Sequence, residues 1–287
     1  MEIIVAKRAG FCFGVKRAVD IAFEMSAGST EGLYTFGPII HNPQVIERLI
    51  ERGVIPVEDI NKEDIKNLII RTHGIPLDLF EEASKRGYGI IDATCPFVKK
   101  AQNYAKLLRD EGYQVIILGD REHPEVKGLV SYAGDDAIVI NSSELFSESL
   151  KELRSKVGVV VQTTQPVDGL RRLVGMLIEH SKELKIYNTI CNSTALRLKE
   201  TEGLAKRVDV MIVVGGRNSA NTTQLANLCR SMPVRTYHIE EADELQEEWF
   251  NGVQRVGITA GASTPEWIIR EVEKKIKDIG GIKGDGD

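Results

Sequence analysis

The sequence predicts an α/β protein made of three similar modules, each with a small and mostly parallel sheet. Short β-branched runs, such as those at 115–118 and 210–214, alternate with stretches whose apolar residues follow helical spacing. Three cysteines, Cys12, Cys95 and Cys191, occupy equivalent places in this alternation. Polar loops recur at similar distances after each of them, so an internal repeat organises most of the chain.

Each of these cysteines lies where a short strand gives way to a helix. In "AGFCFGVKRAVDIAFE" the apolar residues recur with helical spacing, so a helix begins at or just after Cys12, behind a strand at Ile3–Ala6. In "IIDATCPFVKK" a strand ends near Asp92 and the proline suits the first helical turn, which puts Cys95 close to the N-cap. "YNTICNSTALRLKE" repeats the arrangement at Cys191.

Two further landmarks follow each cysteine in the same order. About 28 residues on, a strand, a glycine turn and a helix start recur in "YTFGPIIHNPQVIERL", "VIILGDREHPEVKGL" and "MIVVGGRNSANTTQLANL". A strand and a small polar loop ending in proline then close each module, in "LIIRTHGIP", "VGVVVQTTQP" and "RVGITAGASTP". The expected modules are 12–95, 96–190 and 191–280, with the N-terminal strand of segment 1–11 packed on the third.

The repeat predicts one chemical site at the C-terminal ends of the strands. Ligands of parallel α/β units bind there, where loops lead into helix N-termini. The partial positive charge of a helix N-terminus lowers the pKa of a thiol and attracts anions. Three modules around a pseudo-threefold axis would bring the three thiolates together, ringed by polar side chains from the recurring loops. These side chains are His41, His73, His123, Thr163, Ser219, Asn221 and Ser263.

The wide spacing of the cysteines favours a 4Fe-4S cluster. Zinc ribbons and small ferredoxins use closely spaced cysteine pairs, which this chain lacks. Three protein thiolates match a cluster in which one iron stays open, and such an iron is a Lewis acid beside a source of electrons. The histidines lie beside glycine or proline, where they suit hydrogen bonds to phosphate oxygens. Glu125, two residues after His123, is the carboxylate that suits proton transfer.

Composition limits the class of protein. The chain has 287 residues with 28% charged and 42% hydrophobic residues and a formal charge of −5, which is typical of a globular protein and disfavours nucleic acid as a partner. No apolar run approaches the roughly 18 residues of a membrane-spanning helix, and no signal-peptide core follows Met1, so a cytoplasmic protein is expected. Four cysteines are too few for a disulfide scaffold in a chain of this length.

At these residues the sequence resembles the LytB family, the iron–sulfur reductases that act on 4-hydroxy-3-methylbut-2-enyl diphosphate in the non-mevalonate isoprenoid pathway. The resemblance runs from about Ile3 to Ile276 and rests on motifs that occur in the family order. They are "GFCFGVKRAV", "GPIIHNPQVI", "RTHGIP", "DATCPFV", "HPEVKG", "QTTQ", "ICNST", "GGRNSANT" and "TAGASTP". The resemblance implies a trefoil of three α/β domains around a central cavity that holds the cluster and the diphosphate.

The resemblance also implies residue roles and a reaction. By motif, the cluster ligands are Cys12, Cys95 and Cys191, and the diphosphate ligands are His41, His73, His123, Ser219, Asn221 and Ser263. Glu125, with His123, takes the place of the proton relay, and Thr163 lies near the substrate hydroxyl. Many relatives have a second serine where this chain has Ala220, so one diphosphate contact is missing or made by the backbone. The implied reaction is reductive removal of an allylic hydroxyl. The electrons would come from a ferredoxin or flavodoxin, because the chain has no Rossmann fingerprint for a nicotinamide.

Other residues fit structural roles. Cys229 ends an apolar helical stripe without a counterpart in the other modules, and is expected to be a buried thiol. His180 and His238 also lack counterparts and are assigned to surface or packing positions. The basic residues that follow two of the cysteines are expected on solvated helix faces, the alternative being attraction of anions or of an acidic electron donor. They are Lys16, Arg17, Lys99 and Lys100.

Alternatives stay open for the site residues and for the function. The polar loop residues, Thr164 among them, could cap helices or brace loops instead of binding a ligand. A lyase, such as a cluster-dependent dehydratase or a quinolinate-synthase-like enzyme, also uses three cysteines and an open iron, but without net electron transfer. An iron–sulfur sensor or cluster carrier needs the same thiolates without a diphosphate site.

Overall fold

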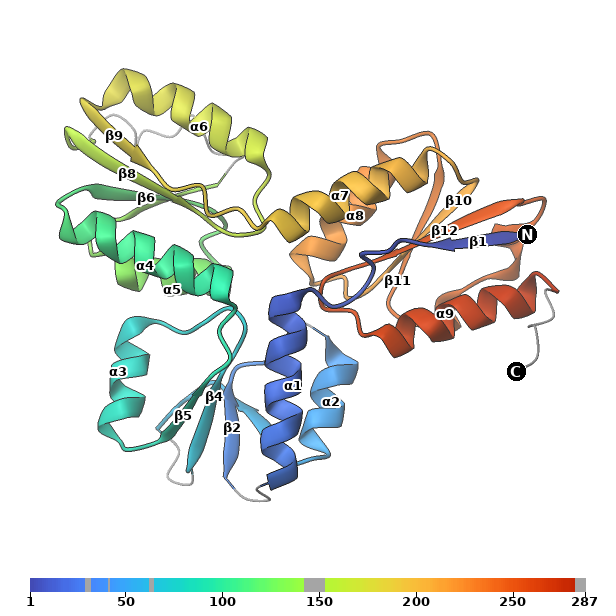
Figure 1. The fold of residues 1–287 in the computed structure, drawn as a ribbon, viewed down its shortest axis with the longest axis horizontal. Coiled ribbons are helices and arrows are strands. Elements are labelled where there is room, and N and C mark those ends of the chain that lie inside the picture. Colours follow the sequence, from blue (N-terminus) through green and yellow to red (C-terminus); the bar gives the residue numbers. More distant parts are fainter. Residues whose placement is uncertain (29–31, 41, 62–64, 142–152, 282–287) are drawn as a thin grey trace. The chain divides into compact units, whose positions relative to one another are not determined.

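The computed structural model describes residues 1–28, 32–40, 42–61, 65–141 and 153–281 (Figure 1). Its strands are β1 (Glu2–Val5), β2 (Leu33–Phe36), β3 (Val54–Val57), β4 (Asn67–Ile70), β5 (Gly89–Asp92), β6 (Gln114–Leu118), β7 (Ile138–Ile140), β8 (Lys156–Val161), β9 (Glu183–Ile186), β10 (Val210–Val214), β11 (Arg235–Ile239) and β12 (Arg255–Ala260). Its α-helices are α1 (Phe13–Gly28), α2 (Pro43–Ile50), α3 (Leu77–Lys85), α4 (Pro96–Asp110), α5 (Pro124–Ala133), α6 (Val167–His180), α7 (Asn192–Ala205), α8 (Ala220–Arg230) and α9 (Glu266–Ile279). Two short 3₁₀ helices are η2 (Ala242–Glu244) and η3 (Glu247–Phe250).

The described strands form three four-stranded sheets that share one strand order. The orders are β3-β2-β4-β5, β7-β6-β8-β9 and β11-β10-β12-β1, and every pairing is parallel. The predicted α/β class with three small parallel sheets is therefore confirmed. In the third sheet the fourth position, held by β5 and β9 elsewhere, is taken by the N-terminal strand β1, which pairs with β12.

Contacts divide the chain into two compact units. Unit 1 consists of Met1–Lys16, Ile40–Arg48 and Asn192–Asp287, and it contains the sheet of β1, β10, β11 and β12. Unit 2 consists of Arg17–Ile39 and Leu49–Cys191, and it contains the other two sheets. The module boundaries expected from the repeat stay a prediction.

The central strands of the β6–β8 sheet and of the β10–β12 sheet are buried almost throughout. Every residue of β6 and of β10 is buried, as is all of β8 and β12 beyond the first residue. Such continuous apolar strands are typical of parallel sheets covered on both faces. Helices α4 and α5 pack on one face of the β6–β8 sheet and α6 on the other, as Figure 1 shows. Each fully buried valine or isoleucine contributes about 1.5–3 kcal/mol to folding, so the strand ends are firmly placed.

The shared strand order places the polar loops. In the sheets of β2–β5 and β6–β9, the connections after the second and third strands run to opposite edges of the sheet; in the third sheet, β10 connects to β11 and β12 is followed by α9. Ligands of parallel α/β sheets bind at the C-terminal ends of such central strands. The loops that follow these strands carry His73 after β4, His123 after β6, Thr163 after β8, Ser219 after β10 and Ser263 after β12. His41, expected after β2, lies outside the described residues. Among the described residues, no helix has the length and apolar character needed to cross a membrane.

Candidate functional site

Each of the three phased cysteines follows the fourth strand of its sheet and is held by an equivalent hydrogen bond. The cysteine N–H donates to a carbonyl oxygen in the loop after the neighbouring third strand. These bonds are Cys12 to Ala262 at 3.3 Å, Cys95 to Thr72 at 2.9 Å and Cys191 to Thr163 at 2.8 Å. The residue that accepts the bond is itself a predicted site residue or precedes one, so the backbone fixes each thiol beside a polar loop.

The same cysteines stand at helix starts, as the sequence predicts. Cys95 is the N-cap of α4, with Pro96 at the first position, and its carbonyl oxygen accepts the N–H of Lys99. The Cys12 carbonyl accepts the N–H of Lys16 in the same way, and Cys191 directly precedes α7. All three are half-buried and none is in a disulfide. The thiolate is the form of cysteine that binds metal.

Arg17 contributes to the placement of Cys95. Its guanidinium donates to the carbonyl oxygens of Asp92 at 3.2 Å and Thr94 at 3.3 Å, in the segment that leads into the cysteine. The expectation that Arg17 lies on a solvated helix face is therefore wrong, because it is half-buried and its donors are used. Lys16, Lys99 and Lys100 are exposed, as expected.

Glu125 and Thr163 form a buried pair. The Glu125 side chain is 1% exposed and Thr163 is 6% exposed. One carboxylate oxygen accepts the Thr163 N–H at 2.6 Å, and the other accepts the Thr163 hydroxyl at 2.8 Å. Burial raises the pKa of Glu125 from 4.5 to about 7, against the opposing effect of the two hydrogen bonds. A carboxyl group with this pKa holds a proton near neutral pH and can also release it.

His73 and His123 lie edge to face beside this pair. Their ring centroids are 5.2 Å apart, with an angle of 87° between the ring planes. His123 is also the N-cap of α5, where its Nδ1 accepts the N–H of Glu125 at 3.1 Å. A neutral His123 ring therefore carries its proton on Nε2. The capping role that the sequence offers as an alternative is real, and it fixes the ring orientation.

These contacts make a continuous group within unit 2, which we call the Glu125 group. It contains Cys95, His73, His123, Glu125, Thr163 and Cys191. Cys95 bonds the residue before His73, the two histidine rings meet, and His123 bonds the backbone of Glu125. Glu125 bonds Thr163, and the Thr163 carbonyl accepts the Cys191 N–H.

A second group lies within unit 1 and contains Cys12, Ser219, Asn221 and Ser263, which we call the Ser219 group. The Ser263 hydroxyl donates to the Ser219 hydroxyl at 3.5 Å. The Asn221 Oδ1 accepts the N–H of Ala262, the residue whose carbonyl holds Cys12. Ser219, Asn221 and Ser263 are each 6–7% exposed, and within the described part of the chain the Asn221 Nδ2 has no hydrogen-bond partner. A buried amide donor of this kind suits a ligand oxygen.

Ser219 caps α8, as the alternative interpretation holds, by accepting the Thr222 N–H at 3.4 Å. Thr164 does not cap α6, because the N-cap there is Pro166 and no side chain bonds to it. Thr222 fills the space beside Gly261, where an added Cβ would lie 1.9 Å from the Thr222 hydroxyl. Glycine is therefore required where the β12 loop passes the start of α8.

A buried arginine that the sequence analysis did not single out supports the Cys12 loop. Arg197 on α7 is 3% exposed, and its guanidinium donates to the carbonyl oxygens of Ala260, at 2.9 Å, and Arg8. One turn along α7, the Glu200 carboxylate accepts the N–H groups of Lys7 and Arg8, each at 2.9 Å. The helix that follows Cys191 thus fixes the approaches to both Cys12 and Ser263.

The residues that were assigned structural roles mostly have them. Cys229 is fully buried in an apolar cluster, and burial raises the pKa of its thiol to about 11, so this cysteine stays protonated. His180 is exposed at the end of α6. His238 is half-buried, and its Nε2 lies 2.8 Å from the carbonyl oxygen of Gly215, in the loop that leads to Ser219.

Comparison with known proteins places the chain in a family. The sequence matches the family described as LytB protein over residues 3–277. The chain belongs to the LytB family. A LytB relative named 4-hydroxy-3-methylbut-2-enyl diphosphate reductase, from Pelobacter propionicus, is 50% identical over 279 residues, which is 97% of this chain and 99% of the relative. A relative of the same name from Geobacter sulfurreducens is 50% identical over 280 residues, which is 97% of this chain and 98% of the relative.

Solved LytB structures agree with this fold. One of (E)-4-hydroxy-3-methyl-but-2-enyl diphosphate reductase, described as the terminal enzyme of the non-mevalonate pathway, is 47% identical with a TM-score of 0.75. The match covers 97% of this chain and all of that chain. The reductase from Plasmodium falciparum is 28% identical with a TM-score of 0.84, and the match covers 96% of this chain and 87% of that one.

The LytB name leads us to expect an iron–sulfur centre, and the residues present fit one. Within the described residues, no three His, Cys, Asp or Glu side chains are gathered as ligands of a metal ion, and the three thiols are divided between the two units. Their chemistry is nevertheless that of cluster ligands, since all three are half-buried thiols at helix starts with equivalent backbone bonds.

Proposed function

We propose that this chain is a 4Fe-4S reductase of (E)-4-hydroxy-3-methylbut-2-enyl diphosphate that forms isopentenyl and dimethylallyl diphosphates. The observation that carries the proposal is the Glu125–Thr163 pair, a buried proton donor whose hydrogen-bonded chain reaches Cys191. The names of relatives that are about half identical over nearly the full chain support the same substrate. The reaction consumes two electrons and two protons and releases water.

Cys12, Cys95 and Cys191 would hold the cluster, because each is a half-buried thiol at a helix start. When bound, the cluster supplies electrons and a Lewis-acidic iron for the allylic oxygen. The equivalent backbone bonds at the three cysteines position the loops that would carry the ligands. Arg197 and Glu200 also hold the backbone of the segment that leads to Cys12, and Arg17 holds the backbone of the segment that leads to Cys95.

Hydrogen-bond donors would bind the diphosphate. We assign this role to His41, His73, His123, Ser219, Asn221 and Ser263. The Asn221 amide is a buried donor without a hydrogen-bond partner among the described residues, and the hydroxyls of Ser219 and Ser263 lie next to each other. Buried hydroxyl and amide donors bind a phosphate oxygen at little desolvation cost, because they carry no charge of their own. Ala220, exposed at the first position of α8, supplies no side-chain contact.

Glu125 would deliver the proton to the leaving hydroxyl. With a pKa of about 7 it is partly protonated at neutral pH, and among the described residues the only side chain that donates to its carboxylate is Thr163. When Glu125 is protonated, the direction of that hydrogen bond can reverse, so that Glu125 donates to the Thr163 oxygen and the Thr163 hydroxyl donates onward to the substrate. The surrounding burial keeps bulk water away from this proton.

The electrons would come from a separate carrier, a ferredoxin or flavodoxin, in the cytoplasm. The decisive experiment is turnover by the anaerobic, cluster-loaded chain with a chemical reductant and the allylic diphosphate, followed by product analysis. We expect isopentenyl and dimethylallyl diphosphates with a reductant and no product without one. Conversion of the substrate in the absence of reductant would instead identify a lyase, and would overturn the proposal.

A further inference from the structure

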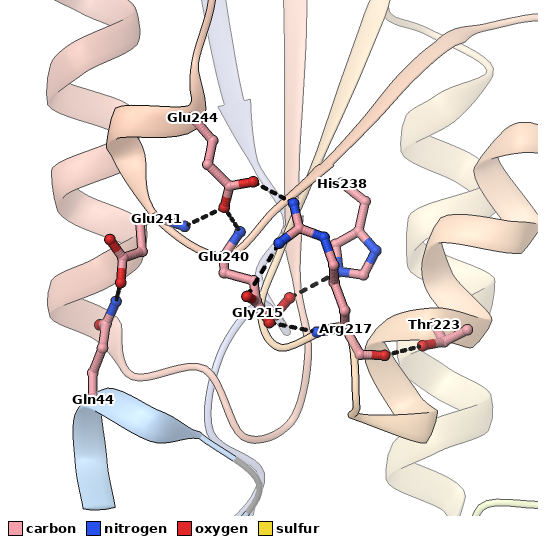
Figure 2. Close-up of polar contacts among 8 residues, drawn as sticks. All are labelled: Gln44, Gly215, Arg217, Thr223, His238, Glu240, Glu241 and Glu244. Atoms are coloured by element: carbon pink, nitrogen blue, oxygen red, sulfur yellow. Dashed lines mark hydrogen bonds and ion pairs between the residues drawn. The ribbon is translucent and has the colours of Figure 1, made fainter. Parts of the chain in front are cut away.

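The loop that presents Ser219 is held from outside by three side chains from the end of β11 and η2 (Figure 2). This loop, which we call the 215–219 loop, connects β10 to α8. His238 Nε2 lies 2.8 Å from the carbonyl oxygen of Gly215, where the loop begins. The ring fixes the first peptide of the loop, and the remaining contacts are made to Arg217.

Arg217, at the centre of the loop, is bonded through both its backbone and its side chain. Its N–H donates to one carboxylate oxygen of Glu240 at 2.7 Å, and its guanidinium donates to the other at 3.1 Å. The guanidinium also donates to Glu244. The carbonyl oxygen of Arg217 accepts the hydroxyl of Thr223 at 3.1 Å, one turn into α8. The peptide two residues before Ser219 is therefore fixed on both sides.

The carboxylates are held in turn by their own segment. Glu244 accepts the N–H of Glu240 at 2.6 Å and that of Glu241 at 3.2 Å. The bond from Glu241 is one half of a capping box for η2, in which the Glu241 side chain accepts the backbone N–H of Glu244. The adjacent Glu241 accepts the side-chain amide of Gln44, in the first turn of α2, at 2.9 Å. Figure 2 shows the Arg217 guanidinium bonded to Glu240 and Glu244 on the side of the loop toward η2.

The charges of this cluster decide what Arg217 does. An arginine two residues from a phosphate-binding serine is a plausible anion ligand on sequence grounds. Here its guanidinium is bonded to two carboxylates, so its positive charge is matched by Glu240 and Glu244. Burial adds little to the strength of these ion pairs, since the Arg217 side chain is 53% exposed and those of Glu240 and Glu244 are 36% and 34% exposed.

We propose that Arg217 and Glu240 are positioning residues that set the 215–219 loop for diphosphate binding, and that Arg217 is not itself a ligand of the anion. The inference rests on the proposed function, because it concerns the same substrate. A loop fixed before binding loses less conformational freedom when the diphosphate arrives. The affinity of the protein for diphosphate therefore depends on the contacts of His238, Glu240 and Glu244 with this loop, which we call the clamp. The hydroxyl of Ser219 and the amide of Asn221 are the groups that the clamp places.

The sign of one substitution separates positioning from direct binding. If Arg217 bound the anion, Glu240→Gln would remove one of the two carboxylates that compete for its guanidinium, and would tighten or preserve binding. If the clamp positions the loop, Glu240→Gln weakens binding of inorganic diphosphate and raises the KM for the allylic diphosphate, each by about three- to tenfold, with little change in kcat. Both are measured on the anaerobic, cluster-loaded full chain, by calorimetry and by steady-state kinetics.

Two further variants complete the test. Arg217→Lys keeps the charge but cannot bridge two carboxylates, so it weakens binding as Glu240→Gln does, whereas an anion ligand would tolerate it better. The matched control is Asp243→Asn, a change of the same charge within η2 whose partner is Lys275 rather than the loop. It leaves affinity and KM unchanged. The Arg217→Gln, Glu240→Gln double variant binds no more weakly than the weaker of its two single variants.

The outcomes separate the two proposals. Wild-type protein that turns over the allylic diphosphate, with Glu240→Gln binding as tightly as wild type or more tightly, overturns the clamp alone. Wild-type protein that neither binds nor reduces the allylic diphosphate overturns the proposed function and the clamp with it. The clamp is supported if Glu240→Gln binds diphosphate more weakly than wild type while its thermal midpoint stays unchanged, and if Asp243→Asn keeps the wild-type affinity and KM.

Discussion

The Glu125 group and the Ser219 group stand on sheets of the same strand order but carry opposite chemistry. In the Glu125 group, burial holds an ionisable carboxyl near its titration point, with two imidazole rings beside it. In the Ser219 group, buried hydroxyls and an amide offer neutral hydrogen-bond donors, and the nearby charges are paired outside the loop. On the proposed function, one backbone arrangement would serve proton transfer or anion binding according to the side chains at its strand ends.

Loss of a proposed cluster ligand should give the largest effect of the variants considered. We expect Cys191→Ser to abolish the visible absorbance of the cluster and the bound iron, because a hydroxyl does not replace a thiolate ligand. Cys229→Ser is the matched control, since this thiol is buried in an apolar cluster and outside both groups, and it should retain the iron. Anaerobic iron and sulfide analysis measures both. Full iron content in Cys191→Ser would remove this residue from the ligand set.

Replacement of the acid should affect chemistry without affecting binding. Glu125→Gln keeps the size of the side chain but cannot donate an acidic proton, so we expect kcat to fall by about a hundredfold or more. The affinity for inorganic diphosphate and the iron content should stay unchanged. Single-turnover kinetics with calorimetry test this. Wild-type turnover in the variant would exclude Glu125 from the proton relay.

The raised pKa of Glu125 also makes stability depend on pH in a defined direction. The folded pKa of about 7 exceeds the ordinary value of 4.5, so the folded state binds more protons between these values. The contribution of protonated Glu125 to the stability of the folded state is therefore fully present below about pH 4.5 and is lost as pH rises toward 7. The loss is of the order of 3 kcal/mol. Urea unfolding at several pH values measures the free energy of unfolding of wild type and of Glu125→Gln. This free energy should change less steeply with pH in the variant than in wild type. Identical slopes would place the titration elsewhere.

Substitution in the Ser219 group should have the smallest effect and the opposite kinetic signature. Ser263→Ala removes one neutral donor and leaves the loop backbone intact, so we expect the KM for the allylic diphosphate to rise about three- to tenfold with kcat nearly unchanged. Steady-state kinetics of Ser263→Ala and Glu125→Gln, measured side by side, test whether the first variant changes KM and the second changes kcat. A fall in kcat without a change in KM would contradict the contrast between the two groups.

Local signals in the sequence predict much of this arrangement. The positions of Cys12, Cys95 and Cys191 at helix starts follow from helical spacing and from Pro96, which are properties of neighbouring residues. The repeat of strand and loop also predicts three parallel sheets, because each module supplies the same kinds of element. His123 and Ser219 were identified as site residues, and their additional capping roles were open alternatives that the structure shows to be real.

The supporting contacts were beyond sequence reasoning, because they join distant segments. Arg197 bonds carbonyl oxygens 189 and 63 residues away, and no local pattern distinguishes it from a surface arginine on a helix. Arg17 was misplaced for the same reason, since its acceptors lie 75 and 77 residues further along the chain. Carbonyl acceptors have no sequence signature at all, so a side chain that uses them is recognised only in three dimensions.

The pairing of β1 with β12 has a consequence for biosynthesis. Strand β1 is made before the other described strands, whereas its partner β12 is made after them, so β1 must wait until most of the described residues have been synthesised. The segment Leu49–Cys191 is continuous and can fold while translation proceeds. The loop of Cys12 gains its bond to Ala262 only after that residue has been made, by which time Cys95 and Cys191 have already been synthesised.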